Sequence, residues 1–125
     1  MTASSVLLDT HVLLWVIARS RRQEEVSSLR KGHAWALSPV SLLEIKFLSE
    51  IGRIEADFPG LLSQLRQDDR FRIDDIGLED LCNAACDLSW TRDPFDRFLV
   101  AHSMIRSLPL GTVDETIRKN HSMTV

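Results

Sequence analysis

Short apolar runs alternate with longer helical patterns along the chain. Residues 6–8 (Val-Leu-Leu) are continuously apolar, which is typical of a strand buried on both faces. Further strands are predicted at Ala34–Leu37, Phe71–Ile73, 108–113 and 122–125. Of these, Phe71–Ile73 alternates only modestly and is expected at an edge. Strands that alternate with helices indicate βαβ units and a mainly parallel sheet, so the fold class is α/β.

The predicted helices have recognisable starts and stops. Ser38 and Pro39 supply the N-cap and first position of a helix that ends at Gly52. Asp93 and Pro94 do the same for a helix that runs to about Ser107. The other helices are expected over 12–17, 19–31, 61–70, 78–90 and 114–120, with a break at 59–60. No repeat, low-complexity segment or linker is visible, so residues 1–125 are expected to form a single domain.

Composition narrows the class of protein only a little. A chain of 125 residues that is 44% hydrophobic can bury a sizeable core. Its first 18 residues hold short apolar runs broken by Asp9 and His11, which predicts neither a signal peptide nor a membrane span. The net charge of −3 does not favour a nucleic-acid binder. It does not exclude one either, because a group of metal-binding carboxylates would itself make the balance negative.

The two cysteines predict no bridge and no zinc site. Cys82 and Cys86 lie four apart in a helical pattern and therefore share a helix face. Without a second pair or a pair of histidines, zinc binding is not supported. Two buried, reduced side chains are the expectation, and a reducing cytoplasm is the expected compartment.

Four carboxylates occupy the places where α/β sheets usually hold their chemistry. Asp9 and Asp114 follow predicted strands, while Glu44 and Asp96 lie in early turns of helices. Ligands of open α/β sheets bind at the carboxyl ends of the strands. Carboxylates gathered there would repel one another unless a cation held them. Hard oxygen ligands suit Mg²⁺ or Mn²⁺, so a site for one of these ions is the leading hypothesis.

Each carboxylate also has a structural explanation. Asp9 and Asp114 could cap helices, although Thr10 could cap in place of Asp9. Asp93 is assigned to the N-cap and Asp96 to a ligand role, although a helix dipole alone would favour both. Glu44 shares a face with apolar side chains and could form a buried ion pair or lie at the exposed edge of that stripe. The stripe consists of Val40, Phe47, Leu48 and Ile51.

Several segments together resemble the PIN domain family, and specifically the VapC-like toxins of prokaryotic toxin–antitoxin pairs. The segments are 7–15 (Leu-Leu-Asp-Thr-His-Val-Leu-Leu-Trp), 41–45 (Ser-Leu-Leu-Glu-Ile), 93–97 (Asp-Pro-Phe-Asp-Arg) with Ala101, and 112–114 (Thr-Val-Asp). They occur in the order of the family, and the resemblance covers nearly the whole chain. Two departures are Gly111, where a β-branched residue is usual, and a short tail after Asn120.

The resemblance implies a three-layer α/β/α fold around a five-stranded, mainly parallel sheet. It also implies a ribonuclease that depends on Mg²⁺ or Mn²⁺ and leaves a 5′-phosphate and a 3′-hydroxyl. The implied catalytic and metal-holding residues are Asp9, Glu44, Asp96 and Asp114. The implied accessory residues are Thr10 and Thr112 near the metal, with Asp93 and Arg97 beside Asp96. RNA is the implied substrate, and the implied partners are a second copy and a small VapB-like antitoxin that blocks the acidic groove.

Other interpretations remain open. A PIN-like scaffold could bind RNA or a protein without cutting, since fold does not guarantee function. A receiver-like signalling domain would also use carboxylates at strand ends, but it would leave Glu44 without a role. The basic residues expected near the groove are assigned mostly to solubility, except Arg97; the set is Lys46, Arg53, Arg92, Arg97, Arg118 and Lys119. His11 is expected at the groove edge and His102 in the core.

Overall fold

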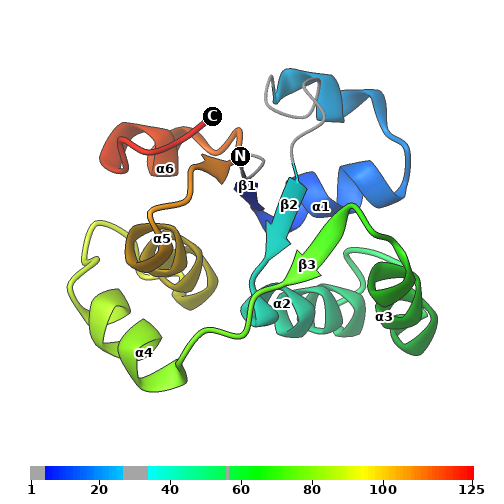
Figure 1. Ribbon diagram of the computed structural model, residues 1–125, viewed down its shortest axis with the longest axis horizontal. Coiled ribbons are helices and arrows are strands. Elements are labelled where there is room, and N and C mark those ends of the chain that lie inside the picture. The colour runs from blue at the N-terminus through cyan, green and yellow to red at the C-terminus, as the bar shows by residue number, and fades with distance from the viewer. Residues whose placement is uncertain (1–4, 27–33, 56) are drawn as a thin grey trace.

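The computed structural model describes residues 5–26, 34–55 and 57–125 (Figure 1). Its strands are β1 (Ser5–Leu8), β2 (Ala34–Leu37), β3 (Phe71–Ile73) and β4 (Leu110–Gly111). Its α-helices are α1 (Thr10–Ile17), α2 (Pro39–Glu50), α3 (Phe58–Gln67), α4 (Leu78–Cys86), α5 (Pro94–Arg106) and α6 (Glu115–Asn120). A short 3-10 helix, η1, spans Arg21–Glu25.

The strands form one parallel sheet in the order β3-β2-β1-β4. The predicted parallel sheet and the edge position of β3 are confirmed. Among the described residues the sheet has four strands where five were expected. Residues 122–125 contribute an isolated parallel bridge between Leu110 and Thr124, because their partner β4 is itself only two residues long. Pro109 immediately before β4 has no N–H to extend the ladder.

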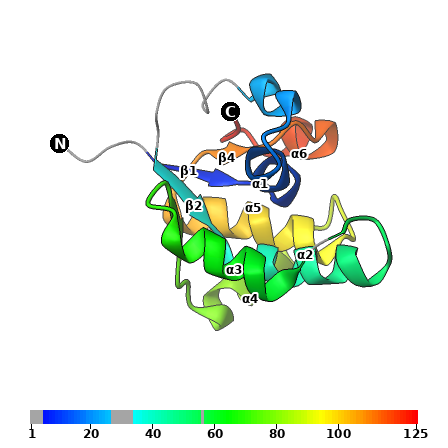
Figure 2. The ribbon, with the colours of Figure 1, turned by 90° about the vertical axis from the view of Figure 1, so that its right-hand side faces the viewer.

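Helices cover both faces of the sheet, which confirms the three-layer architecture (Figures 1 and 2). Successive strand residues point to opposite faces. Leu7 of β1 therefore packs in a core with α4 and α5, whereas its neighbours Val6 and Leu8 pack in a second core with α1, α2 and α3. Figure 2 looks onto the side that carries α1 and α3. The continuous apolar run of β1 follows from this burial on both faces.

Gly111 permits a close approach of β4 to β1. A Cβ added there would lie 3.1 Å from Cγ1 of Val6 and 3.4 Å from Cδ2 of Leu8. The missing side chain therefore makes room for the neighbouring strand. This close packing explains why a β-branched residue is absent here.

Several predicted helix bounds need correction, among them the break expected at 59–60, which lies inside α3. Helix α3 begins at Phe58, three residues before the predicted start at 61. Pro59 is tolerated in the first turn because a backbone N–H at that position would have no partner within the helix. Helix α4 ends at Cys86, short of residue 90. In place of a helix over 19–31, the structure has the 3-10 helix η1, and residues 27–33 lie outside the described part of the chain.

The cysteines are free, but the prediction that they are buried is wrong. Cys82 and Cys86 are both exposed. Helix α4 buries Leu81 and Ala85, and each cysteine follows one of them. One residue turns the helix by about 100°, which places both thiols on the solvent side.

In the described ranges, no helix combines the length and the apolar character needed to cross a membrane.

Candidate active site

Four element ends meet at the carboxyl edge of the sheet. Asp9 follows β1, Thr112 and Asp114 follow β4, and α2 and α5 begin at this edge with the caps Ser38 and Asp93. The charges of the acidic side chains act on one another here. Asp96 shows this most clearly, since burial raises its pKa and the charges of Asp93 and of carboxylates from three other segments raise it further. The structure therefore brings the predicted acidic residues into one electrostatic neighbourhood.

The side chain of Asp9 is turned away from capping. Its backbone occupies the N-cap of α1, but its carboxylate makes no cap hydrogen bond. Instead, the buried Thr112 donates a hydrogen bond from Oγ1 to Oδ2 of Asp9 over 2.6 Å. Burial raises the pKa of Asp9, and the bond from Thr112 and the charge of His11 oppose that rise. The bond places Thr112, an accessory residue implied by the resemblance, directly against the carboxylate of Asp9.

Thr10 does not take over the capping role either. Its hydroxyl donates to Oγ of Ser41 over 2.9 Å, and both residues are buried. This contact joins the first turn of α1 to the first turn of α2, one turn before Glu44. Ser41 was part of the segment that resembles the PIN family, but no pattern in the sequence gave it a partner, because the two residues are 31 positions apart.

Glu44 is buried on α2 beside Ser41, Ile45 and Leu48. The expected apolar stripe around it is wrong in part, since Phe47 and Ile51 are exposed. Within the described part of the chain no ion pair involves Glu44. Burial raises the pKa of Glu44, as do the charges of Asp9 and Asp93, while Thr10 and His11 oppose the rise.

Helix α5 starts as its sequence predicted. Oδ1 of Asp93 accepts hydrogen bonds from the backbone N–H of Phe95 at 2.9 Å and of Asp96 at 3.3 Å. The cap role of Asp93 is thereby confirmed. Asp96 is half-buried, and burial raises its pKa to about 7, with added contributions from Asp93, Asp9, Asp114 and Glu44.

Asp114 caps α6 and is exposed. Its Oδ1 accepts from the backbone N–H of Ile117 at 2.9 Å, and its own N–H donates to Oγ1 of Thr112 at 3.1 Å. The Thr112 hydroxyl thus contacts both Asp9 and the backbone of Asp114. One buried hydroxyl thereby links the ends of β1 and β4.

Two of the basic residues expected near the groove hold backbone carbonyls. Arg97 donates from Nε to the carbonyl of Thr91 over 2.7 Å. Arg118 donates from Nη1 to the carbonyls of Thr112 at 2.9 Å and Val125 at 3.1 Å. Arg97 thus steadies the loop before α5, and Arg118 steadies the segment that carries Thr112.

The core position predicted for His102 is confirmed, and His11 lies at the surface near the carboxylates. His11 is exposed, and its charge acts on Asp9 and Glu44, while His102 is fully buried. Sequence reasoning missed the partner of His102. Asp74, just after β3, accepts from Nε2 of His102 at 2.7 Å and from Nε of Arg106 at 2.8 Å. The sequence did offer a signal, because Asp74 is another acidic residue directly after a strand, but its carboxylate is occupied by a histidine and an arginine.

The chemistry of the carboxylates fits a hard divalent cation, although their spacing does not form a ligand shell. Asp9, Glu44 and Asp96 all have a raised pKa, so a positive charge among them would be stabilising. However, across the described ranges no three His, Cys, Asp or Glu side chains are placed to hold a metal ion. Charge interactions reach well beyond the ligand distance of about 2.1 Å for Mg²⁺, and like charges keep carboxylates apart when no cation is among them.

Comparison with known proteins identifies the fold and the family. The model of the PIN domain family matches residues 6–121. Ribonuclease VapC22 of Mycobacterium tuberculosis is 31% identical over 124 residues, covering 94% of this chain and 92% of the relative. A chain of a toxin–antitoxin complex from Klebsiella pneumoniae has the same fold, with a TM-score of 0.61, 19% identity and coverage of 90% of this chain and 89% of that one. The match along nearly its whole length shows that the chain belongs to the PIN domain family, and that its relatives there include a VapC protein.

Proposed function

We propose that this protein is a divalent-metal-dependent endoribonuclease of the VapC type. The observation that carries the proposal is the half-buried Asp96, whose pKa is raised to about 7 by burial and by the carboxylates around it. A strongly raised pKa in a group of like charges is typical of a functional site. The name of the relative, a ribonuclease, supports RNA as the substrate. Membership of the PIN family also removes the receiver-like interpretation.

Asp9, Glu44, Asp96 and Asp114 would hold Mg²⁺ or Mn²⁺. When bound, such an ion supplies a water of lowered pKa and positive charge opposite the phosphoryl oxygens. Thr112 holds the carboxylate of Asp9 through one oxygen, Oδ2, so the other oxygen, Oδ1, would be the one to meet the ion.

The remaining residues of the site position the carboxylates. Asp93 fixes the first turn of α5 and thereby the backbone of Asp96. Thr10 and Ser41 hold the first turns of α1 and α2 together next to Glu44. Arg97 would act by steadying the loop that leads into α5.

The proposal includes partners and a compartment. A small VapB-like antitoxin would neutralise the enzyme, and the structural neighbour supports this because it comes from a toxin–antitoxin complex. A homodimer in the cytoplasm is proposed as well, and the free, exposed cysteines are compatible with a reducing compartment.

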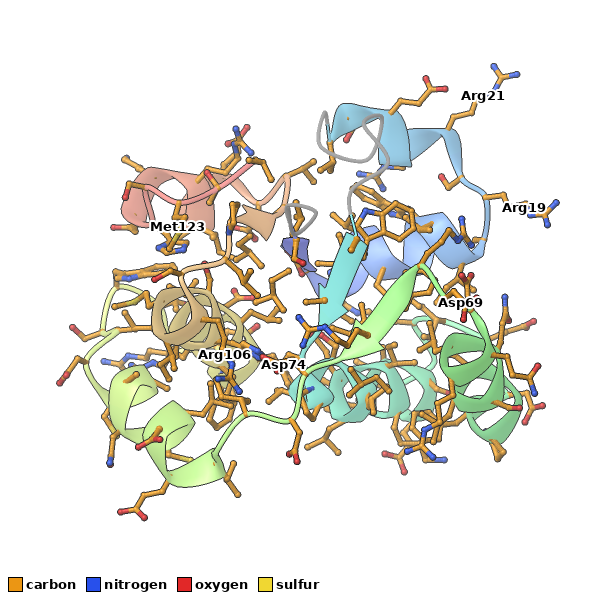
Figure 3. All side chains as sticks on the ribbon, in the orientation of Figure 1. Arg19, Arg21, Asp69, Asp74, Arg106 and Met123 are labelled. Carbon is orange, nitrogen blue, oxygen red and sulfur yellow. The ribbon has the colours of Figure 1, made fainter. Side chains whose placement is uncertain are left out.

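The test is cleavage of a pool of structured RNAs by the purified protein with Mg²⁺ or Mn²⁺ and with EDTA. Asp96→Asn removes one charge from the site, and Asp69→Asn is the matched control, because Asp69 is an exposed carboxylate in the turn before β3 (Figure 3). Cutting that requires the metal, is lost in Asp96→Asn and is kept in Asp69→Asn supports the proposal. Equal cutting by all three proteins, or cutting in EDTA, would refute it.

A second candidate is a scaffold that binds RNA without cutting. The spacing of the carboxylates, which form no ligand shell within the described ranges, favours it. RNA binding by a well-folded protein that cuts nothing with either ion would select this candidate.

A further inference from the structure

Helix α2 exposes an apolar stripe beside the candidate active site. Leu43, Phe47 and Ile51 are 64%, 44% and 50% exposed, and their spacing of four residues places them on one side of the helix. The ring of Phe47 also contacts Phe95 of α5, with ring centroids 5.7 Å apart and planes tilted by 35°. An aromatic pair therefore spans the two helices.

The aromatic pair borders the carboxylates on both helices. Phe47 lies one turn after Glu44, so the two are neighbours on the surface of α2. Phe95 immediately precedes Asp96, and its N–H is held by the Asp93 cap. The charges of Glu44 and Asp93 also act on each other across the two helices. Each ring of the aromatic pair therefore lies next to one of the proposed metal-binding carboxylates.

The charges at this edge can hold an RNA backbone but not a base. The chain has a net charge of −3, and the site itself gathers carboxylates. Lys46 of α2 and Arg92, just before α5, are exposed and can meet phosphates, but a phosphate contact does not hold a base. A base next to the acids therefore needs a contact of its own. Stacking of a base on an aromatic ring is such a contact, and it tolerates any base.

We propose that Phe47 and Phe95 form a platform on which a nucleobase stacks next to the phosphodiester bond that is cleaved. This inference rests on the proposed function, because it takes RNA as the substrate. A base that stacks on the rings must be unpaired, so the platform would position unpaired nucleotides with little preference for their identity.

A second copy of the chain could also cover an apolar stripe of this kind. The two occupants make different demands on residue 47. A protein interface needs apolar volume, which leucine supplies, whereas a base needs the face of a ring. Phe47→Leu and Phe47→Trp therefore separate the two, and the partial exposure of residue 47 makes both substitutions tolerable for folding.

The experiment measures binding of a fluorescently labelled single-stranded RNA by anisotropy, in an Asp96→Asn background so that the RNA stays intact. Phe47→Leu should weaken binding about tenfold, and Phe47→Trp should retain it within about threefold. Leu78→Ala is the control, since Leu78 is 68% exposed at the start of α4, and it should change nothing. An abasic strand of the same length should bind the Asp96→Asn parent about as weakly as the Phe47→Leu variant binds intact RNA.

Failure of the platform and failure of the nuclease give different results. Equal binding by Phe47→Leu and Phe47→Trp, or no measurable binding of RNA by the parent protein, would overturn the platform. The platform would also be overturned if Phe47→Leu changed the oligomeric state measured by light scattering but still bound RNA as tightly as the parent protein. If any of these results is found but the protein with Asp96 intact still cuts RNA, the nuclease proposal stands and the platform is rejected. If it cuts nothing but binding follows the ring, the platform stands and the nuclease proposal falls.

Discussion

Thr112 is the residue on which the orientation of Asp9 most directly depends. Replacing it with valine keeps the shape but leaves the buried carboxylate without its 2.6 Å donor. An unsatisfied buried acceptor costs about 1–3 kcal/mol, so the free energy of unfolding should fall by that amount. Urea titration measures this, and RNA cleavage should slow as well.

Thr112→Ser supplies the matched control, because serine retains the hydroxyl. Thr112→Ser should cleave RNA at nearly the wild-type rate, even if loss of the methyl group lowers the free energy of unfolding. If serine were as slow as valine, the hydrogen bond to Asp9 would have no part in catalysis.

Asp96 should give the metal-free protein an unusual dependence on pH. Burial, with the nearby acidic charges, raises the pKa of Asp96 from 3.8 to about 7 in the folded state. The folded protein therefore holds a proton that the unfolded chain has released. The resulting stability is full at low pH and is lost as the pH rises through about 7.

This loss can be measured by urea titration in EDTA. The free energy of unfolding of the wild type should decrease between about pH 4 and about pH 7, and that of Asp96→Asn should decrease less. Parallel pH profiles of the two proteins would show that Asp96 is not held in the protonated form.

At the scale of elements, Asp74 ties β3 to α5. Its carboxylate lies beside Arg106 in Figure 3 and also receives the bond from the buried His102. Burial raises the pKa of Asp74, but the bonds from His102 and Arg106 outweigh it, so the pKa lies below its usual value. Asp74→Ala would leave His102 without a partner and should lower the free energy of unfolding by about 2 kcal/mol in a urea titration.

The neighbouring Asp75 gives the control for that substitution. Asp75 is exposed, and it meets Arg106 through its backbone carbonyl, which Asp75→Ala would keep. Losses of equal size in the two variants would mean that the Asp74 carboxylate does not join the elements.

The elements that the sequence predicted well are those whose signals are local. The cap at Ser38, the cap at Asp93 and the two-sided burial of β1 follow from neighbouring residues and were found as expected. The errors arose where distant packing decides. Residues 122–125 lack a long strand to pair with, and the cysteines of α4 lie one position away from its buried face.

In the candidate site, too, the local features were predicted and the contacts between distant segments were not. The pattern of carboxylates near strand ends and helix starts is enough to propose Asp9, Glu44, Asp96 and Asp114 as one set, because strand ends in a parallel sheet meet at one edge. The bonds Thr112–Asp9 and Thr10–Ser41 join residues 103 and 31 positions apart, which no periodicity encodes. That Phe47 is exposed was missed, because its spacing also suited a buried face.

At the scale of the whole molecule, metal binding and folding should be linked. A ligand that binds only the folded protein adds about 2.7 kcal/mol of stability at 100 times its Kd. Mg²⁺ or Mn²⁺ should therefore raise the Tm of the wild type in proportion to the logarithm of its concentration. Thermal unfolding followed by circular dichroism measures this, and the response should be much smaller in Asp96→Asn. Identical responses would place the bound ion elsewhere.

The solvent face of α4 offers a ready attachment point for probes. Cys82 and Cys86 are the two cysteines of the chain, and both thiols face outward one helical turn apart. A bifunctional spin label could bridge them without any substitution and would be rigidly held by the helix. Pulsed electron resonance would then report a single label-to-label distance if two copies associate, and none if they stay apart. The native cysteines of α4 thus allow the proposed homodimer to be tested by a distance measurement on the unmodified sequence.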